Sequence, residues 1–225
     1  MKKITVLLAE DHQIVREGFR SLLKRERDIA VVGEAENGRQ AVALVKKLQP
    51  AVVVMDIAMP LLNGLEATRQ ICKDFPATRV LILSAHSDEA YVEQVAGLGA
   101  AGFLLKHTSA HELATAIRAI HAGKTFFTPA LSKRLQQRDP QSLSRDGQVK
   151  TKGNQLSSRE IEVLQLIAEG KPNKQVATEL GVSFKTVDKH RQHLMSKLDI
   201  HDIAGLTRYA LAQGIIESNP RVTLR

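Results

Sequence analysis

The spacing of hydrophobic residues changes about halfway along the chain. Up to residue 124, short apolar runs rich in β-branched residues alternate with amphipathic stretches of helical length, which is typical of a parallel α/β sheet. The apolar runs predict strands at 4–9, 30–35, 51–55, 80–84 and 102–105, and the amphipathic stretches predict helices at 12–24, 38–48, 65–74, 87–98 and 109–122. This pattern corresponds to five βα units.

The third predicted strand, 51–55, is apolar at every position. A strand of this kind is typical of the centre of a parallel sheet that is covered by helices on both faces. We therefore expect an α/β, doubly wound, five-stranded parallel sheet. Ligands of such sheets bind at the carboxyl ends of the strands.

The second half of the chain has helical patterns only. Residues 129–138 predict a short helix, and residues 139–154 hold only Leu143 and Val149 as large apolar residues, which indicates a linker of sixteen residues. From residue 156, four helices are expected, at 158–169, 173–180, 184–198 and 203–213. A short helix, the Gly181 turn and a longer helix make a helix-turn-helix.

These patterns divide the chain into four parts. We expect an α/β domain at 1–124, a linker with a short helix at 125–154, a smaller all-α four-helix domain at 155–217 and a tail at 218–225.

The net charge of +8 is divided unevenly between the two halves. Residues 1–124 carry 16 Lys/Arg and 14 Asp/Glu, hence +2, and residues 125–225 carry 16 and 10, hence +6. The basic excess lies in the C-terminal part of the chain, where it would attract a polyanion such as nucleic acid.

Cysteine content and hydropathy predict a cytoplasmic protein. The single Cys72 cannot form an internal disulfide, and no Cys/His spacing resembles a zinc site. The apolar run 4–9 is too short for a signal peptide, and no segment approaches the roughly 20 apolar residues that would cross a bilayer. No membrane partner is expected.

Polar residues stand at the ends of four predicted strands. They are Glu10 and Asp11 after the first, Asp56 after the third, Ser84 at the end of the fourth and Lys106 after the fifth. Three converging carboxylates repel one another unless a cation shares their site, and oxygen ligands of this kind suit Mg²⁺. With its charge neutralised, an aspartate can attack a phosphoryl group, while Lys106 and Ser84 contact the phosphoryl oxygens.

Each of these residues alone has an ordinary structural explanation. Acids after strands often cap the next helix, and a lysine at a strand end is usually solvated. Their joint occurrence at four strand ends favours a phosphoryl-transfer site instead.

Residues 1–124 resemble the receiver domain of response regulators, which has a flavodoxin-like fold. The matching segments are LLAED (7–11), VMDIAMP (54–60), LSA (83–85) and GAAGFLLK (99–106). The resemblance implies that Asp56 accepts phosphate from a sensor histidine kinase, with Mg²⁺ held by Asp11, Asp56 and the carbonyl of Ala58 and with Glu10 assisting. It also implies that Ser84 and Phe103 form a switch pair that responds to the phosphoryl group. One departure is His107, which stands where many receivers have a proline and removes a constraint on the placement of Lys106.

The third helix of the helix-turn-helix domain has two distinct faces. Val187, Leu194 and Leu198 recur at helical spacing and are predicted to be core. The opposite face carries Lys185, Asp188, Lys189 and Gln192, and in a helix-turn-helix it enters the major groove, where these side chains can pair with base edges. Four further residues are expected to meet DNA phosphates: Asn173, Lys174, Thr186 and Lys197.

Residues 156–217 resemble the LuxR-type domain of the NarL and FixJ group of regulators. The matching segments include LSSREIEVL (156–164), AEGKPNKQVA (168–177) and LGVSFKTV (180–187). The resemblance implies a recognition helix at about 184–198 and a dimer contact near the fourth helix. Asp188 departs from the group, which often has lysine there, so Asp188 either reads a cytosine or faces away from DNA.

Together these features predict a two-component response regulator and not an enzyme. Its partners would be a sensor histidine kinase and double-stranded promoter DNA, which it would bind as a homodimer with an affinity controlled by phosphorylation of Asp56. Two alternatives remain. A Mg²⁺-dependent phosphatase would use the same carboxylates, but such enzymes generally carry a second acid two residues after the nucleophile, where this chain has Ala58. A phosphate sink would bind protein in place of DNA and would lack the steep salt dependence of DNA binding.

Overall fold

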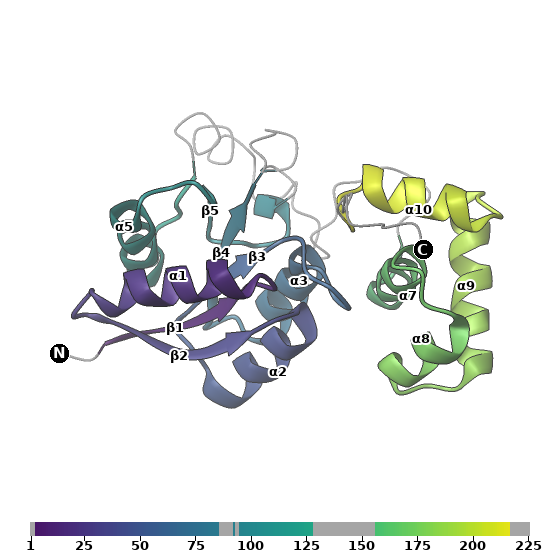
Figure 1. Cartoon of the computed structure of the whole chain (residues 1–225), viewed down its shortest axis with the longest axis horizontal. Helices are drawn as coiled ribbons and strands as arrows, with labels where there is room; N and C mark the ends of the chain where they lie inside the picture. Colours follow the sequence, from purple (N-terminus) through teal and green to yellow (C-terminus); the bar gives the residue numbers. More distant parts are fainter. Residues whose placement is uncertain (1–2, 86–91, 93–94, 128–155, 217–225) are drawn as a thin grey trace. The chain divides into compact units, whose positions relative to one another are not determined.

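A computed structural model describes residues 3–85, 92, 95–127 and 156–216 of the chain (Figure 1). The described residues form two compact units, an α/β unit and a helical unit, which are treated separately below. The predicted short helix 129–138, the linker 139–154 and the tail 218–225 lie outside the described residues.

The first unit is built on a five-stranded parallel sheet. Its strands are β1 (Ile4–Ala9), β2 (Ile29–Ala35), β3 (Val52–Asp56), β4 (Arg79–Ser84) and β5 (Gly102–Leu105). They lie in the order β2-β1-β3-β4-β5, and all neighbouring strands pair in parallel. The order changes direction between β1 and β3, and this switch point is where doubly wound sheets bind their ligands.

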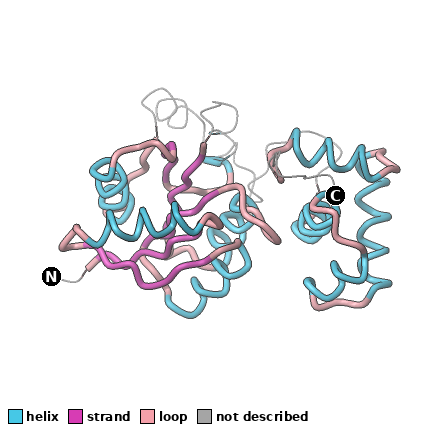
Figure 2. The backbone as a smooth tube through the Cα atoms, viewed as in Figure 1, coloured by secondary structure: helices cyan, strands magenta, loops and turns pink. Residues whose placement is uncertain are grey.

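Helices cover both faces of this sheet (Figure 2). They are α1 (Gln13–Lys24), α2 (Gly38–Leu48), α3 (Gly64–Asp74) and α5 (Ala110–His121). Alternate residues of the strands, such as Leu8 and Val54, share one core cluster with Phe19 of α1 and Ile117 of α5. The residues between them, such as Val53, are equally buried and point to the opposite face, where α2 and α3 contact the sheet.

The sheet is extended at one edge by the chain after α5. Phe126 forms a parallel bridge with Gly102, donates its backbone N–H to Ala101 and accepts from Phe103. The chain therefore stays against β5 beyond residue 124. Of the helix predicted at 87–98, residues 92 and 95–97 are helical, and the others up to residue 94 lie outside the described residues.

The second unit consists of α7 (Ser158–Ala168), α8 (Asn173–Leu180), α9 (Phe184–Leu198) and α10 (Ile203–Ala212). Ser157 begins α7 with a complete capping box to Glu160, and Ser183 caps α9. Its core is a single cluster that joins all four helices, for example through Leu164, Val176, Val187 and Leu206. The predicted fold class, a doubly wound parallel sheet followed by a four-helix unit with a helix-turn-helix, is confirmed.

Several boundaries differ from the sequence prediction by about one residue, and two of these differences have clear reasons. His12 is the N-cap of α1, with an extended backbone, and so does not belong to the helix. Asp56 is the last residue of β3, because it continues the ladder opposite Leu83. Within the described residues, no helix is long and apolar enough to span a membrane.

Candidate functional site

Parallel pairing brings the ends of the central strands to one edge of the sheet. β1 pairs with β3, β3 with β4, and β4 with β5, so Glu10, Asp56, Ser84 and Lys106 stand side by side at the carboxyl edge. Glu10 and Asp56 are each only 3% exposed, and so is Ser84. The sequence predicted this convergence from the strand ends alone.

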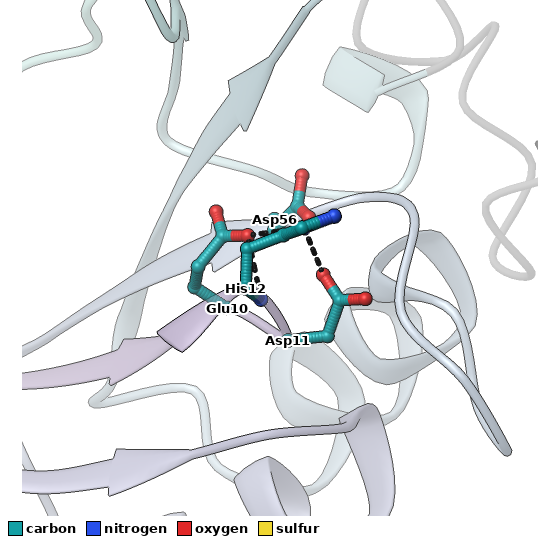
Figure 3. A group of neighbouring side chains, drawn as sticks. All are labelled: Glu10, Asp11, His12 and Asp56. Atoms are coloured by element: carbon teal, nitrogen blue, oxygen red, sulfur yellow. Dashed lines mark hydrogen bonds and ion pairs between the residues drawn. The ribbon is translucent and has the colours of Figure 1, made fainter. Parts of the chain in front are cut away.

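Glu10, Asp11, His12 and Asp56 form an acidic cluster (Figure 3). Each offers one potential ligand atom, and these atoms all lie within 4.8 Å of one another. His12 was not predicted to be part of this site, although it directly follows Asp11 on the β1–α1 connection. The sequence alone does not predict that the His12 ring lies in the cluster, because its position depends on how the chain turns after Asp11.

Two nitrogen atoms bridge the carboxylates. His12 Nδ1 lies 3.1 Å from Glu10 Oε1 and 2.8 Å from Asp11 Oδ1. Lys106 Nζ lies 2.9 Å from Glu10 Oε2 and 2.9 Å from Asp56 Oδ2. The three acids are therefore linked in a row from Asp11 through Glu10 to Asp56, with a nitrogen between each pair.

Burial and repulsion make ionisation of Asp56 costly. Burial, reinforced by the negative charge of Glu10, raises the pKa of Asp56 to about 7, although Lys106 and the Ile57 backbone N–H act in the opposite direction. Burial lowers the pKa of Lys106, but the two carboxylates outweigh this effect and leave its pKa above the usual value. A cation placed among these carboxylates would favour the ionised, nucleophilic form of Asp56.

The donor atoms of the cluster fit a hard divalent cation. One oxygen of each carboxylate, Glu10 Oε2, Asp11 Oδ1 and Asp56 Oδ2, is buried, and its nearest partner is the Lys106 ammonium or, for Asp11, the His12 ring. One ammonium does not balance three carboxylates, and a divalent cation would supply the remaining positive charge. Carboxylate and carbonyl oxygens are the ligands that Mg²⁺ prefers, and Ala58, which is half-buried two residues after Asp56, supplies a carbonyl.

The backbone places Lys106 without the proline found in many receivers. Its N–H donates to the carbonyl of Ser84 at 2.8 Å, and Thr108 closes the following turn on Leu105. These bonds hold the residue after β5 against the end of β4. Phe103, on β5, is 8% exposed and pairs with Ile82.

The helix after Asp56 packs unusually close to it. A Cβ on Gly64, the first residue of α3, would lie 1.9 Å from the carbonyl oxygen of Asp56. Gly64 also donates its N–H to Ile57. Only glycine allows α3 to begin this close to the end of β3.

The helical unit presents a helix-turn-helix. Gly181 has a φ of 62°, ends α8 and turns the chain into α9. Val187 and Leu194 are completely buried on α9, as predicted, whereas Lys185 and Lys189 are exposed. The core face and the polar face of α9 are therefore opposite each other.

Asp188 interacts within this polar face. It is half-buried and accepts a hydrogen bond of 3.1 Å from the side-chain nitrogen of the exposed Gln192, one turn later. The negative charge of Asp188 is thereby directed along the helix toward Gln192. This pairing orients the Gln192 amide, which is a use of Asp188 that the sequence did not suggest.

The four residues predicted to meet phosphates have different surroundings. Lys174 is exposed, whereas Asn173 accepts a hydrogen bond from Arg191 and the Thr186 hydroxyl lies 2.8 Å from the Ser183 hydroxyl. The Lys197 ammonium lies 2.7 Å from the buried carboxylate of Glu160. Contacts of these residues with DNA remain predictions.

Two further residues of α9, which the sequence did not single out, have notable surroundings. Phe184, the first residue of the helix, is 57% exposed, and Arg191 ties α9 to α8 through Asn173.

Comparison with known families assigns both units. Residues 6–118 match the family described as response regulator receiver domain, and residues 154–210 match the bacterial regulatory proteins of the luxR family. The two matches coincide with the α/β unit and with the helix-turn-helix unit.

Known proteins with both units are similar to the chain over nearly its whole length. The transcriptional regulatory protein LiaR of Bacillus subtilis is 38% identical over 207 residues, which cover 92% of this chain and 96% of LiaR. A structure of the RcsB response regulator of Salmonella typhimurium, described in terms of DNA interaction, is 27% identical with a TM-score of 0.59 and covers 94% and 98% of the two chains. A structure of two RcsB dimers bound to two parallel DNAs is 28% identical, has a TM-score of 0.54 and covers 92% and 98%.

Proposed function

The chain belongs to the response regulators that join a receiver domain to a LuxR-type DNA-binding domain, and on this premise we propose that phosphorylation of Asp56 by a sensor histidine kinase controls its binding to promoter DNA. The observation that carries the proposal is the position of Asp56. It is buried at the end of β3, beside Glu10, with Lys106 Nζ 2.9 Å from Oδ2. Regulation of transcription by this chain would then take place in the cytoplasm, where promoter DNA is accessible.

The proposed reaction is transfer of a phosphoryl group from a kinase phosphohistidine. An oxygen of the Asp56 carboxylate attacks phosphorus, the new O–P bond forms as the P–N bond breaks, and the leaving imidazole takes up a proton from solvent. Asp11, Asp56 and the Ala58 carbonyl, assisted by Glu10, would hold Mg²⁺, which when bound offsets the negative charge of the phosphoryl group and the carboxylates.

Lys106 and Ser84 would sense the product. Lys106 Nζ, which contacts both Asp56 and Glu10, is placed to pair with a phosphoryl oxygen on Asp56. The Ser84 hydroxyl, on the neighbouring strand, would donate to another oxygen, and Phe103 would adjust its ring as the second member of the switch pair. The hydrogen bond and the ion pair to the phosphoryl group would favour one of two receiver conformations.

Labelling with a small phosphodonor tests the acceptor. Wild-type chain incubated with radioactive acetyl phosphate and Mg²⁺ should incorporate label, and Asp56→Asn should not. Asp74→Asn, an exposed acid of α3, serves as the matched control and should be labelled normally. Label retained by Asp56→Asn would identify another acceptor and refute the proposal for Asp56.

The proposed DNA surface is the polar face of α9. Lys185, Asp188, Lys189 and Gln192 would face base edges, with Asn173, Lys174, Thr186 and Lys197 near phosphates. Binding as a homodimer would place two such helices on a duplex, as successive half-sites require. The observation that supports this surface is the exposure of the two lysines opposite a fully buried core face.

Lys189→Ala tests this surface. The variant should bind a duplex selected by the wild-type protein from random DNA more weakly and should remain folded, because Lys189 is exposed. Lys124→Ala, an exposed lysine of the receiver, is the control. Equal affinity of wild type and Lys189→Ala over a range of salt concentrations would exclude Lys189 from the interface.

A further inference from the structure

Arg16 is a buried arginine of α1. Its side chain is 9% exposed, whereas that of Arg20, one turn later on the same helix, is 55% exposed. Buried guanidinium groups are rare in proteins unless their donors are paired, because the loss of hydration is costly. The partners of Arg16 therefore indicate why it is buried.

The guanidinium of Arg16 contacts the connection between β1 and α1. Nη1 donates to the backbone carbonyl of Glu10 at 2.6 Å and lies 3.5 Å from that of Asp11. Nη2 donates to Glu36 at 2.8 Å, and Nε lies 3.4 Å from Glu34. Arg16 thus links Glu10 and Asp11, the first two acids of the cluster, to the end of β2.

Hydrogen bonds restrain both peptide groups of Glu10. Its N–H donates to the carbonyl of Ala35 at 3.0 Å, and its carbonyl accepts from Arg16. The backbone angles of Glu10 and Asp11 decide where their carboxylates lie relative to Asp56. A hydrogen bond to the Glu10 carbonyl therefore acts on the geometry of the acidic cluster through the backbone.

We infer that Arg16 is a positioning residue of the phosphoacceptor site, which holds Glu10 and Asp11 where they can bind a divalent cation together with Asp56. The inference rests on the proposed function, since it concerns the cation site used there. Outer groups that orient ligands commonly change metal affinity by about 10–100-fold when they are removed.

The sign of the effect separates positioning from simple electrostatics. Removal of a positive charge near three carboxylates would by Coulomb attraction alone strengthen the binding of Mg²⁺. Loss of positioning would weaken it. Arg16→Ala should therefore bind Mg²⁺ on the order of tenfold more weakly than wild type.

Calorimetric titration of the full chain with Mg²⁺ tests the inference. Arg16→Lys keeps the charge but offers a point contact in place of the guanidinium fork, so it should recover part of the lost affinity. Arg20→Ala is the matched control, because Arg20 shares the helix and pairs with Glu34, on β2, through an exposed side chain. Its Mg²⁺ affinity should equal that of wild type.

A separate variant controls for a general loss of stability. Arg118 on α5 pairs with Glu26 and Asp28, which precede β2 at the end away from Glu34. Arg118→Ala should lower the unfolding temperature without changing Mg²⁺ affinity. If Arg16→Ala fails to fold, Arg16→Lys is the test variant. It should bind Mg²⁺ more weakly than wild type, but by a smaller factor than is expected for Arg16→Ala.

The outcomes distinguish the two hypotheses. Equal or stronger Mg²⁺ binding by both Arg16 variants, beside normal binding by wild type, overturns the role of Arg16 and leaves the proposed function intact. Wild-type chain that binds no Mg²⁺ overturns the metal site and the inference together. Weaker binding by the Arg16 variants, with labelling of Asp56 restored at high Mg²⁺ concentration, supports positioning.

Discussion

Glu160 is a buried acid that connects two helices of the DNA-binding unit. Its side chain is 6% exposed, accepts from the Ser157 backbone at 2.7 Å and lies 2.7 Å from Lys197 Nζ. Burial raises the pKa of Glu160, but the hydrogen bonds from Lys197 and Ser157 outweigh it and hold the pKa below its usual value. The ionised carboxylate therefore stabilises the folded unit.

This pKa shift predicts an acid-sensitive contribution to stability. A carboxylate whose folded pKa is depressed stabilises the folded state above its unfolded pKa, which is about 4.3 for glutamate, and loses that contribution as the pH falls through the folded pKa. Glu160→Gln should lower the free energy of unfolding of the helical unit at neutral pH, and the difference from wild type should shrink below about pH 4.3.

Denaturant unfolding of the full chain at a series of pH values, followed by the methyl NMR signals of Val187 and Leu194, measures this difference in the helical unit. Glu179→Gln is the control, since the Glu179 carboxylate lies 3.7 Å from Lys171 Nζ and is more exposed than that of Glu160, so that its ion pair contributes less. A pH-independent difference between wild type and Glu160→Gln would show that the ionised carboxylate is not the stabilising group.

At the scale of elements, the start of α3 is fixed by its closeness to the phosphoacceptor strand. The carbonyl of Asp56 is part of the backbone and cannot rotate away from a Cβ placed 1.9 Å from it. Gly64→Ala must therefore displace α3, lower the stability of the receiver by about 1–3 kcal/mol and slow the labelling of Asp56. Thermal unfolding and the rate of acetyl phosphate labelling check these two effects.

The matched variant is Gly18→Ala in α1. A Cβ there would meet no atom of the described chain within 4 Å, and alanine favours a helix over glycine by about 0.5–1 kcal/mol. Gly18→Ala should therefore be as stable as wild type or slightly more stable, and it should label normally. Normal labelling of a folded Gly64→Ala protein would show that the position of α3 does not matter for the reaction.

The sequence predicted elements better than it predicted contacts. Alternating apolar runs and glycine or serine boundaries located β1, β5, α2 and α8 to the residue, because these signals are local. The convergence of Glu10, Asp56 and Lys106 was also predictable, since parallel strands must end at one edge.

Contacts between helices and distant segments were not predictable in the same way. Arg16 and Arg20 lie one turn apart on one helix, and nothing in the sequence says that the first is buried and the second is exposed. The pairing of Lys197 with Glu160 spans 37 residues and changes how Lys197 is understood. Such contacts depend on how helices pack, which hydrophobic spacing does not specify.

At the scale of the whole molecule, the chain separates chemistry from recognition. The acidic cluster lies in a unit that carries +2, if residues 1–124 are counted, whereas residues 125–225, which include the helix-turn-helix, carry +6. Regulation of DNA binding by the acidic cluster requires a free energy of coupling between the cluster and the DNA-binding surface. Such a coupling is reciprocal, because each ligand must change the affinity of the other by the same factor.

Reciprocity gives a test that needs no knowledge of the kinase or the promoter. Beryllium fluoride binds aspartate reversibly and mimics a phosphoryl group, so its affinity can be measured at equilibrium. If it strengthens binding to a selected DNA duplex by some factor, the same duplex must strengthen the binding of beryllium fluoride by that factor, typically a coupling of about 1–3 kcal/mol.

Two titrations of the full chain measure this coupling, one of DNA with and without beryllium fluoride and one of beryllium fluoride with and without DNA. Asp56→Asn should bind DNA with an affinity that beryllium fluoride does not alter. Wild-type chain that binds both ligands independently would contradict regulation of DNA binding through Asp56. A ligand with equal affinity for both conformations does not shift the equilibrium between them.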